Sequence, residues 1–502
     1  MQTNVLEYLE RTWAQDPEKV VFSDERESIT FSALHERALA LCAGITPYFQ
    51  QGEPVIVIME KSIHTILSYL AVLYGGGYYV PIDAELPAHR IESIFALVDA
   101  SLVLTDRATE ATVSALHYAG KTIVVDAPEA LPRLGATDRW RSCCDTDAMY
   151  VIFTSGSTGV PKGVVTSHRA VIDYIDAFTE VTKITPADVF GNQAPLDYVA
   201  AIRDLYLPMK TGASTVLIPK KLFSLPARLF DYLDEKAVTT ICWVVSALCI
   251  PAKLNAFDYK VPRTIQKVIF TGAVMPTKYL ALWQRYLPNA MYVNHYGPTE
   301  ITASCTYHIF DHIVTETEKL PIGKPYRNTA ILLLDENDRL ISAPDIKGEI
   351  CVRGTCLASG YFKDPDRSAA SFVQNPANAL YTDPIYRTGD LGSYDEQGVL
   401  WFHGRTDNQI KHMGHRIEMS EVEHAAKTMP LVEECCCLYQ TEKELLYLFY
   451  EGITVSPAEL SAYLRTLLPT FMIPRRLIPM ERLPLRFNGK IDVQALKAQM
   501  GA

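Results

Sequence analysis

The chain has 502 residues, enough for two or three domains of ordinary size with a buried core. Apolar residues make up 48% and charged residues 21%, which argues against a disordered or fibrous protein. The 58 acidic and 47 basic residues give a net charge of −11, and no Lys/Arg-rich stretch is present. Binding to nucleic acid is therefore not expected, because phosphate neutralisation needs a basic surface.

The sequence gives no sign of export or of a membrane anchor. The N-terminus MQTNVLEYLERTWAQDPEKV has no basic region followed by an apolar core, so we expect no signal peptide. The most apolar helical stretch, 63–74, is too short to span a bilayer. Of the 11 cysteines, Cys435, Cys436 and Cys437 are consecutive, which predicts reduced thiols in a buried strand and leaves a metal site as the alternative. We expect a cytoplasmic protein.

Short apolar, β-branched runs alternate with helical patterns over the first four-fifths of the chain. Strands are predicted at 54–60, 78–82, 101–105, 122–126, 149–155, 214–219 and 267–272, with helices such as 32–45 between them. This alternation is typical of α/β units with parallel sheets. After about residue 320, the glycine-punctuated strands AILLLD, GEICVRG and VLWFHG predict a smaller, mostly β part. Beyond GRTDNQ, the helical SEVEHAAKTM and strands within 431–451 predict an α+β tail, which gives two domains, 1–406 and 407–502.

The strongest local motif is TSGSTGVPKG, directly after the strand predicted at 149–155. Backbone N–H groups and hydroxyls without side-chain bulk form an anion cradle of the kind that holds phosphates, and Lys162 adds a positive charge. The motif is not a Walker A loop, because Pro161 stands where that loop has its second glycine and Gly163 follows the lysine. A flexible surface loop would explain the glycines but not a lysine among so many hydroxyls. The predicted phosphate-binding residues are Thr154, Ser155, Gly156, Ser157, Thr158, Gly159 and Lys162.

TSGSTGVPKG resembles the phosphate-loop signature of the adenylate-forming superfamily, which includes amino-acid adenylation domains of nonribosomal peptide synthetases, D-alanine–carrier-protein ligases and acyl-CoA synthetases. Further stretches resemble the motifs of that superfamily in the same order along the chain. They are NHYGPTE (294–300), GEICVRGTCLASGYF (348–362), YRTGDLG (386–392), GRTDNQIKHMGHRIEMSEVE (404–423) and NGKID (488–492). The chain is therefore identified as a member of the superfamily, most similar to stand-alone amino-acid adenylation domains. The resemblance implies large, doubly wound α/β sheets with a small β-barrel-like part, followed by a small, mobile α+β C-terminal domain.

The resemblance also implies the reaction: the carboxylate of a small acid attacks the α-phosphate of ATP, pyrophosphate leaves, and an acyl-adenylate forms. ATP and Mg²⁺ are the expected cofactors, and one carboxylate suffices for Mg²⁺ because this ion usually keeps several waters. Without the resemblance, Glu300 would pass for a surface carboxylate and Asp390 for an Asx turn beside Gly389. By matching, Glu300 binds the metal, Thr299 contacts phosphate, Tyr296 and Gly297 lie at the adenine, Asp390 accepts hydrogen bonds from the ribose hydroxyls, and Arg405 approaches ribose or phosphate oxygens.

Two residues of the C-terminal part receive roles from the same resemblance. Lys490 in NGKID matches the catalytic lysine, whose ammonium offsets the repulsion between the attacking carboxylate and the α-phosphate. The alternative for Lys490 is a hairpin turn with a solvated lysine. Asp407 matches the hinge about which the C-terminal domain turns between adenylation and thioester formation.

The expected acyl acceptor is the phosphopantetheine thiol of a separate carrier protein. Only 12 residues follow Lys490, and they contain no carrier attachment motif. Two alternatives stay open: an acyl-CoA or aryl-acid ligase, and a relative that binds a nucleotide without turnover.

The acid site departs from the pattern of the family. Amino-acid adenylation enzymes usually place an aspartate there to pair with the α-ammonium, and an ungapped alignment puts Val199 at this position, after Tyr198. Asp197 lies two residues earlier, on the same face if the segment is extended. The other matching positions are Ala200, Arg203, Cys242, Ile269, Thr271, Gly272, His295, Ala303 and Ser304.

This departure predicts a small carboxylic acid that is not an ordinary α-amino acid, because Val199 cannot pair with a buried ammonium. Arg203 and His295 would suit an acid with a carboxylate or another acceptor at its far end. A surface salt bridge from Arg203 to Asp204 or Asp197 is the alternative for the arginine. A hydrogen-bonded core histidine is the alternative for His295.

Overall fold

The computed structural model describes residues 2–127, 138–156, 161–407, 409–441, 443–452, 454–486 and 491–500. The chain forms two compact units. The first contains Met1–Asp83, Asp99–Ile152 and Gly163–Thr406; the second contains Ala84–Val98, Phe153–Lys162 and Asp407–Ala502. No described helix combines the length and the apolar character needed to cross a bilayer.

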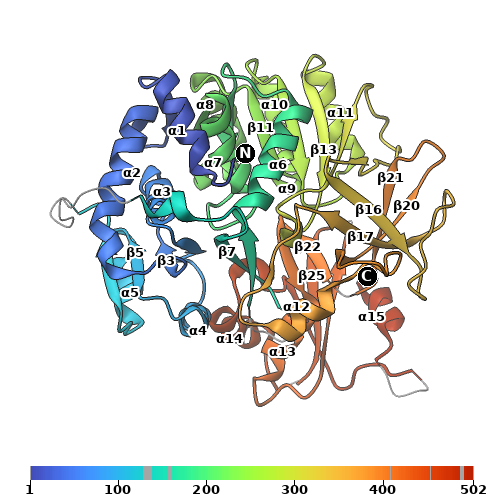
Figure 1. The fold of residues 1–502 in the computed structure, drawn as a ribbon. Coiled ribbons are helices and arrows are strands. Elements are labelled where there is room, and N and C mark those ends of the chain that lie inside the picture. Colours follow the sequence, from blue (N-terminus) through green and yellow to red (C-terminus); the bar gives the residue numbers. More distant parts are fainter. Residues whose placement is uncertain are drawn as a thin grey trace. The chain divides into compact units, whose positions relative to one another are not determined.

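A nine-stranded sheet in the first unit, whose strands β11 and β13 are labelled in Figure 1, carries Cys242, Ile269, Thr271 and His295 of the predicted acid site. Its order is β15-β14-β13-β12-β11-β9-β10-β1-β2, parallel from β13 to β1 and antiparallel at both edges. The strands are β1 (Val20–Ser23), β2 (Ser28–Thr30), β9 (Val189–Asn192), β10 (Ser214–Leu217), β11 (Thr240–Val244), β12 (Lys267–Thr271), β13 (Met291–Tyr296), β14 (Thr306–Phe310) and β15 (Lys324–Pro325).

A seven-stranded sheet has the order β18-β8-β7-β4-β3-β5-β6. Its strands are β3 (Pro54–Ile58), β4 (Tyr78–Ile82), β5 (Leu102–Thr105), β6 (Lys121–Val124), β7 (Ala148–Thr154), β8 (Lys162–Ser167) and β18 (Gly360–Tyr361). The helices of the first unit are α1 (Leu6–Gln15), α2 (Phe31–Ile45), α3 (Ile63–Tyr74), α5 (Glu110–Ala115), α6 (His168–Thr182), α7 (Ala201–Thr211), α8 (Pro226–Glu235), α9 (Val245–Lys253), α10 (Ala256–Tyr259), α11 (Thr277–Tyr286) and α12 (Pro365–Ser371).

Side-chain alternation along the strands gives the nine-stranded sheet two apolar faces. Cys242 and Ile269 point into a core shared with α1, α2, α3, α6, α7 and strands of the other sheet. Their neighbours Trp243 and Phe270 point into a second core with α8, α9 and α11. A sheet whose strands alternate between two cores is covered on both faces, which is the doubly wound arrangement.

Several helices begin at hydroxyl caps. The side chains of Thr30, Ser62 and Ser167 accept hydrogen bonds from backbone N–H groups in the first turns of α2, α3 and α6. Such caps satisfy donors that would otherwise be unpaired at a helix start. They fix where these helices begin relative to the strands before them.

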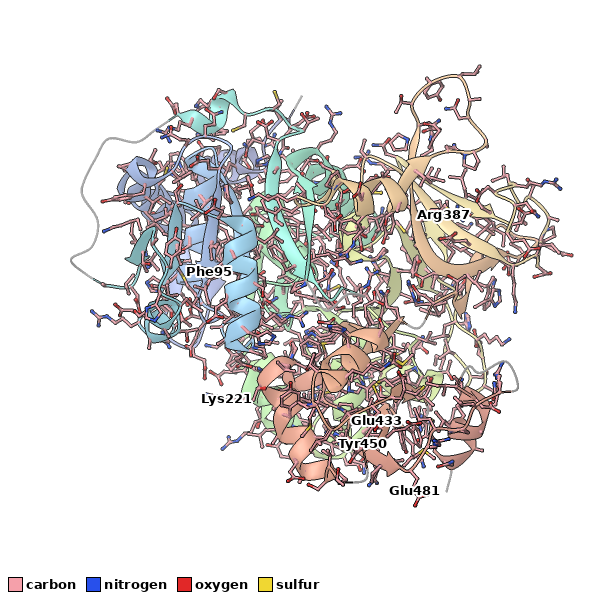
Figure 2. The ribbon with its side chains drawn as sticks, turned by 90° about the horizontal axis from the view of Figure 1, so that it is seen from below. Phe95, Lys221, Arg387, Glu433, Tyr450 and Glu481 are labelled. Atoms are coloured by element: carbon pink, nitrogen blue, oxygen red, sulfur yellow. The ribbon has the colours of Figure 1, made fainter. Side chains whose placement is uncertain are left out.

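A smaller β part completes the first unit (Figure 1). It consists of β16 (Thr329–Leu334), β17 (Gly348–Gly354), β19 (Phe372–Gln374), β20 (Pro384–Tyr394) and β21 (Leu400–Arg405), in the order β16-β17-β20-β19 with β21 paired to β20. Arg387 of β20, labelled in Figure 2, forms ion pairs with Glu349 of β17 at 2.6 Å and with Asp338 at 2.7 Å. These pairs link neighbouring segments of this β part.

The second unit is α+β. It contains α4 (Ala88–Val98), β22 (Gln409–His412), β23 (His415–Glu418), α13 (Met419–Lys427), β24 (Cys435–Gln440), β25 (Leu445–Glu451), α14 (Pro457–Leu467), β26 (Arg476–Met480) and α15 (Val493–Gln499). Cys435 and Cys437 pack in one apolar cluster and Cys436 in another, as expected for consecutive residues of a buried strand. The predicted buried cysteine strand is confirmed.

The predicted fold class is confirmed: doubly wound α/β sheets, a small β part and an α+β C-terminal part. The strands predicted from 54 to 272 lie within one to two residues of β3, β4, β5, β6, β7, β10 and β12. The assignment of 84–98 and 153–162 to the second unit was not predicted from the sequence.

Candidate active site

Tyr296, at the end of β13, leads into the loop that carries Glu300. Gly297 has no room for a side chain, because a Cβ there would lie 2.5 Å from the Cα of Ser304. The chain then turns back through Thr302 and Ala303, which have φ values of +59° and +75°. This close approach explains why a glycine follows Tyr296.

The Glu300 side chain is completely buried, with 0% of its surface exposed. Its Oε1 accepts a hydrogen bond from the Tyr361 hydroxyl at 2.9 Å, and its backbone carbonyl accepts from the Ala358 N–H at 2.9 Å. The alternative of a surface carboxylate is therefore wrong. Burial of a carboxylate is costly unless it is hydrogen-bonded or binds a cation, so Glu300 is suited to hold a metal ion.

Asp390 connects three segments of the first unit. Its Oδ2 accepts a hydrogen bond from the Tyr296 hydroxyl at 2.5 Å, and its Oδ1 accepts from Arg405 Nη1 at 2.5 Å. The other terminal nitrogen of Arg405 donates to the Thr388 carbonyl at 3.0 Å. The Asx turn is not the arrangement found, since the Thr388 hydroxyl accepts from the Asp390 N–H instead.

Protonation of Tyr296 follows from its surroundings. Burial, together with the negative charge of Asp390, raises the pKa of Tyr296 well above its ordinary value. The hydroxyl therefore stays protonated and donates to the carboxylate. The ring also packs with the β part, 6.3 Å from Phe402 between ring centroids.

These residues fit the expected nucleotide and metal. A carboxylate has about four lone-pair sites, so Asp390 keeps acceptor capacity beyond its bonds to Tyr296 and Arg405. Within the described ranges, no three His, Cys, Asp or Glu side chains gather as a closed metal site. Mg²⁺ is usually held by one or two carboxylates together with phosphate oxygens and waters, and Glu300 can supply such a ligand.

The predicted phosphate loop falls in the second unit where it is described. Thr154, Ser155 and Lys162 are buried, and the Ser155 hydroxyl donates to the Arg416 carbonyl at 2.8 Å. The Thr154 hydroxyl is buried and finds no hydrogen-bond partner among the described residues. An unpartnered buried hydroxyl costs about 1–3 kcal/mol, so this atom fits a ligand oxygen. Ser157, Thr158, Gly159 and Lys490 lie outside the described residues.

The residues predicted for the acid site lie together in the first unit. Val199, Ala200, Cys242, Ile269 and Ala303 are buried in one apolar cluster. Cys242 lies opposite Ile269, which lies opposite Val293 on the next strand. Parallel α/β sheets bind ligands at the carboxyl ends of their strands, where Thr271 and His295 stand.

Arg203 is 2% exposed, so the ion pair with Asp204 that was given as an alternative is present but is buried and not on the surface. Its Nη2 donates to the Cys242 carbonyl at 3.0 Å. Its Nε lies 3.8 Å from Asp204 Oδ1, an ion-pair distance without a hydrogen bond. Arg203 Nε and Asp204 Oδ1 find no hydrogen-bond partner in the part of the chain that is described.

His295 is buried beside aromatic rings, with Phe178 at 5.0 Å between ring centroids. Its Nδ1 lies 2.6 Å from the Tyr326 hydroxyl and 3.4 Å from the Ser304 hydroxyl. Burial and the positive charge of Arg203 lower the pKa of His295 well below its ordinary value, so the ring is neutral. Its Nε2 finds no partner among the described residues, so His295 is not a fully satisfied core histidine.

Asp197 does not meet the condition under which it would share a face with Val199. The chain from 196 to 200 forms turns and a bend before α7, so the side chains do not alternate as in a strand. Asp197 is half-buried near Tyr69, where its charge adds to the burial that raises the pKa of that tyrosine.

Several residues of these clusters were not predicted from the sequence. Tyr361 could have been noticed within GYF, but nothing in the sequence indicates its bond to Glu300. Tyr174 lies four residues before Phe178 on α6, a spacing that indicates a shared helix face. Lys61 carries no sequence signal, because the contacts that bury it join distant segments.

A family model described as AMP-binding enzyme matches residues 9–362. The chain belongs to this family. Tyrocidine synthase 1 of Brevibacillus parabrevis is 30% identical over 96% of this chain, and the chain spans 43% of that relative. The predicted membership of the adenylate-forming superfamily is confirmed.

Two solved structures support the same relationship. One is PA1221, an NRPS protein containing adenylation and PCP domains, with 27% identity and a TM-score of 0.85 over 99% of this chain and 84% of that one. The other is IdnL1, with 27% identity and a TM-score of 0.83 over 96% of this chain and 99% of that one.

Proposed function

We propose that this chain adenylates a small carboxylic acid and transfers the acyl group to the phosphopantetheine thiol of a separate carrier protein. In the first step a carboxylate oxygen attacks the α-phosphorus of ATP, and the bond to the pyrophosphate oxygen breaks. In the second step the thiol sulfur attacks the acyl carbon, the thiol proton leaves, and AMP departs.

The observation that carries this proposal is the buried Asp390 carboxylate, held by Tyr296 and Arg405, within a chain of the AMP-binding enzyme family. Asp390 and Arg405 would bind the ribose, with Tyr296 and Gly297 at the adenine. By resemblance, Thr154, Ser155, Gly156 and Lys162 would bind phosphate oxygens, and Thr299 would contact phosphate. Glu300 would hold Mg²⁺, which neutralises phosphate charge when bound.

The domain roles are part of the same proposal. Residues 1–406 would bind the acid and ATP, and residues 407–502 would bring Lys490 to the α-phosphate. Rotation about Asp407 would then withdraw Lys490 so that the thiol can enter. The adenylation and PCP domains named for PA1221 support a carrier protein as the acceptor.

The acid would lack an α-ammonium. Val199 is 5% exposed and offers no counter-charge, and the nearby Arg203 guanidinium repels a second cation. Burying an ammonium group without a counter-charge costs on the order of several kcal/mol. Hydroxy, keto, aryl and dicarboxylic acids avoid this cost.

ATP–pyrophosphate exchange with a panel of acids tests the proposal. The panel contains the proteinogenic amino acids beside hydroxy, keto, aryl and dicarboxylic acids, and each active acid is then offered a phosphopantetheinylated carrier protein or coenzyme A. Exchange with one class of acid and loading of the carrier would support the proposal. Binding of ATP without exchange for any acid would favour a non-catalytic relative, and loading of coenzyme A alone would favour an acyl-CoA ligase.

A further inference from the structure

Two buried N–H donors in the acid site find no acceptor in the described part of the chain. They are Arg203 Nε and His295 Nε2. Burial keeps the pKa of Tyr326 well above its ordinary value, so its protonated hydroxyl can donate to His295 Nδ1, which lies 2.6 Å away. In that arrangement the imidazole proton is on Nε2, which makes this nitrogen a donor.

The two donors belong to one cluster. The Ser304 hydroxyl lies 3.4 Å from His295 Nδ1 and donates to the Tyr174 hydroxyl at 3.3 Å. Tyr174 and Arg203 in turn interact electrostatically. Because an unmet buried donor costs about 1–3 kcal/mol, two of them around one cluster indicate a ligand that supplies two acceptors.

The charges around Arg203 favour an anionic ligand. Asp204 provides a carboxylate beside the guanidinium, but without a hydrogen bond between them. The Lys61 ammonium donates to the carbonyls of Asn192, Gln193 and Ile218 and also acts on Asp204. Burial lowers the pKa of Lys61 to about 7 and raises the pKa of Asp204 to about 6, whereas Arg203 stays charged. The guanidinium is therefore the cation that a ligand carboxylate would meet.

We propose that the acid activated by this chain carries a second carboxylate, which accepts hydrogen bonds from Arg203 Nε and His295 Nε2. The inference rests on the adenylation proposed above and names the substrate class. The first carboxylate is the one that reacts, and the second fixes the orientation of the acid. A carboxylate supplies two acceptor oxygens and one negative charge, which are the features that this cluster lacks.

The test compares each dicarboxylic acid with its own monoamide in ATP–pyrophosphate exchange. The acids are succinic, glutaric, adipic and isophthalic acid. Each acid and its monoamide are alike in length and shape and differ in the charge of the second carboxyl group. We expect the preferred diacid to exceed its monoamide about 30-fold or more in kcat/KM, which is the lower end for a buried charge pair. The substitution Arg203→Met should remove this preference, with a higher KM for the diacid and little change for the monoamide.

Two further variants separate recognition from folding. The double variant Arg203→Met/Asp204→Asn removes both charges of the original pair. It should therefore fold even if Arg203→Met alone is destabilised by an unpaired Asp204. It should still lack the preference for the diacid. Arg37→Met removes an arginine paired with Glu27 at 2.8 Å outside the acid site, and should keep the preference. Equal turnover of diacid and monoamide by the unsubstituted protein, or a preference unchanged by Arg203→Met, would overturn the inference.

Isothermal titration of the diacids without ATP gives a readout independent of turnover. Binding of the preferred diacid that weakens about 30-fold in Arg203→Met would support the assignment. If no acid supports exchange, the proposed adenylation fails, and this titration still decides whether the cluster binds a second carboxylate.

Discussion

The Asp390→Asn substitution tests the best-defined part of the proposed nucleotide site. The asparagine keeps the size of the side chain, but its NH₂ group must face one of the two donors, Tyr296 or Arg405, that now point at carboxylate oxygens. Hydrogen bonds to a charged group contribute about 1.5–3 kcal/mol each. Breaking a buried ion pair costs about 3–5 kcal/mol. We expect the lower end, a loss of about 3 kcal/mol in the free energy of unfolding, because the Arg405 side chain is 15% exposed and keeps its hydrogen bond to the Thr388 carbonyl.

The same substitution should weaken ATP binding through the ribose. Loss of one charge-assisted hydrogen bond corresponds to a rise of about 10- to 150-fold in the KM for ATP. The comparison with 2′-deoxy-ATP isolates this effect: the unsubstituted protein should discriminate against the deoxynucleotide, and Asp390→Asn should not. Asp395→Asn is the matched control, because Asp395 lies in the turn of the same β20–β21 hairpin and accepts from Trp401 at 2.9 Å.

Chemical unfolding and steady-state exchange kinetics measure the two effects separately. A double-mutant cycle of Asp390→Asn with Tyr296→Phe gives the coupling between the hydroxyl and the carboxylate. Discrimination against 2′-deoxy-ATP that persists in Asp390→Asn would refute the ribose role. Stability unchanged by both substitutions would refute the energetic reasoning about the buried bonds.

The fold was predictable because its signals are local. Strands such as 54–58 and 267–271 are buried on both faces, so nearly all of their residues are apolar and many are β-branched. Such unbroken apolar runs between helical segments predict strands. Consecutive cysteines at 435–437 could be placed in a strand from alternation alone. The limits of the second unit could not be predicted from the sequence, because residues 84–98 and 153–162 join this unit through contacts between segments that are far apart in the chain.

The sequence supplied the residues of the candidate site but not the contacts among them. Matching to the family gave Tyr296 and Asp390 separately, whereas the bond between them joins positions 94 residues apart. Arg203 was placed on the surface in one alternative because charged side chains are rarely buried. α7, which carries Arg203, packs against β9 and β10, and the Cys242 carbonyl of β11 accepts a hydrogen bond from the guanidinium. No local pattern in APLDYVAAIRDLY encodes that contact.

Further predictions concern catalysis, motion, the metal and pH. Lys490→Ala should reduce pyrophosphate exchange by orders of magnitude while ATP binding by calorimetry persists, because the lysine acts in the transition state; near-normal exchange would remove its catalytic role. Asp407→Pro should affect exchange and carrier loading unequally, since proline fixes φ at about −65°, and equal losses in a folded protein would count against a hinge. Glu300→Gln should raise the Mg²⁺ concentration needed for exchange while the Tyr361 hydroxyl keeps an acceptor; an unaltered magnesium titration would place the metal ligand elsewhere. His168 is 2% exposed, its Nδ1 accepts from the Val5 N–H at 3.4 Å, and burial lowers its pKa to about 4. Between pH 4 and 6.5 the unfolded chain binds a proton that the folded chain does not, so the stability that His168 contributes is present above pH 6.5 and is lost as the pH falls toward 4. The difference corresponds to about 3 kcal/mol, and His168→Asn should flatten the pH dependence of the unfolding free energy by that amount. Deuterium exchange at the imidazole carbon, followed by mass spectrometry across this pH range, measures the pKa directly, and a midpoint near pH 6.5 would show that the buried ring is not held neutral.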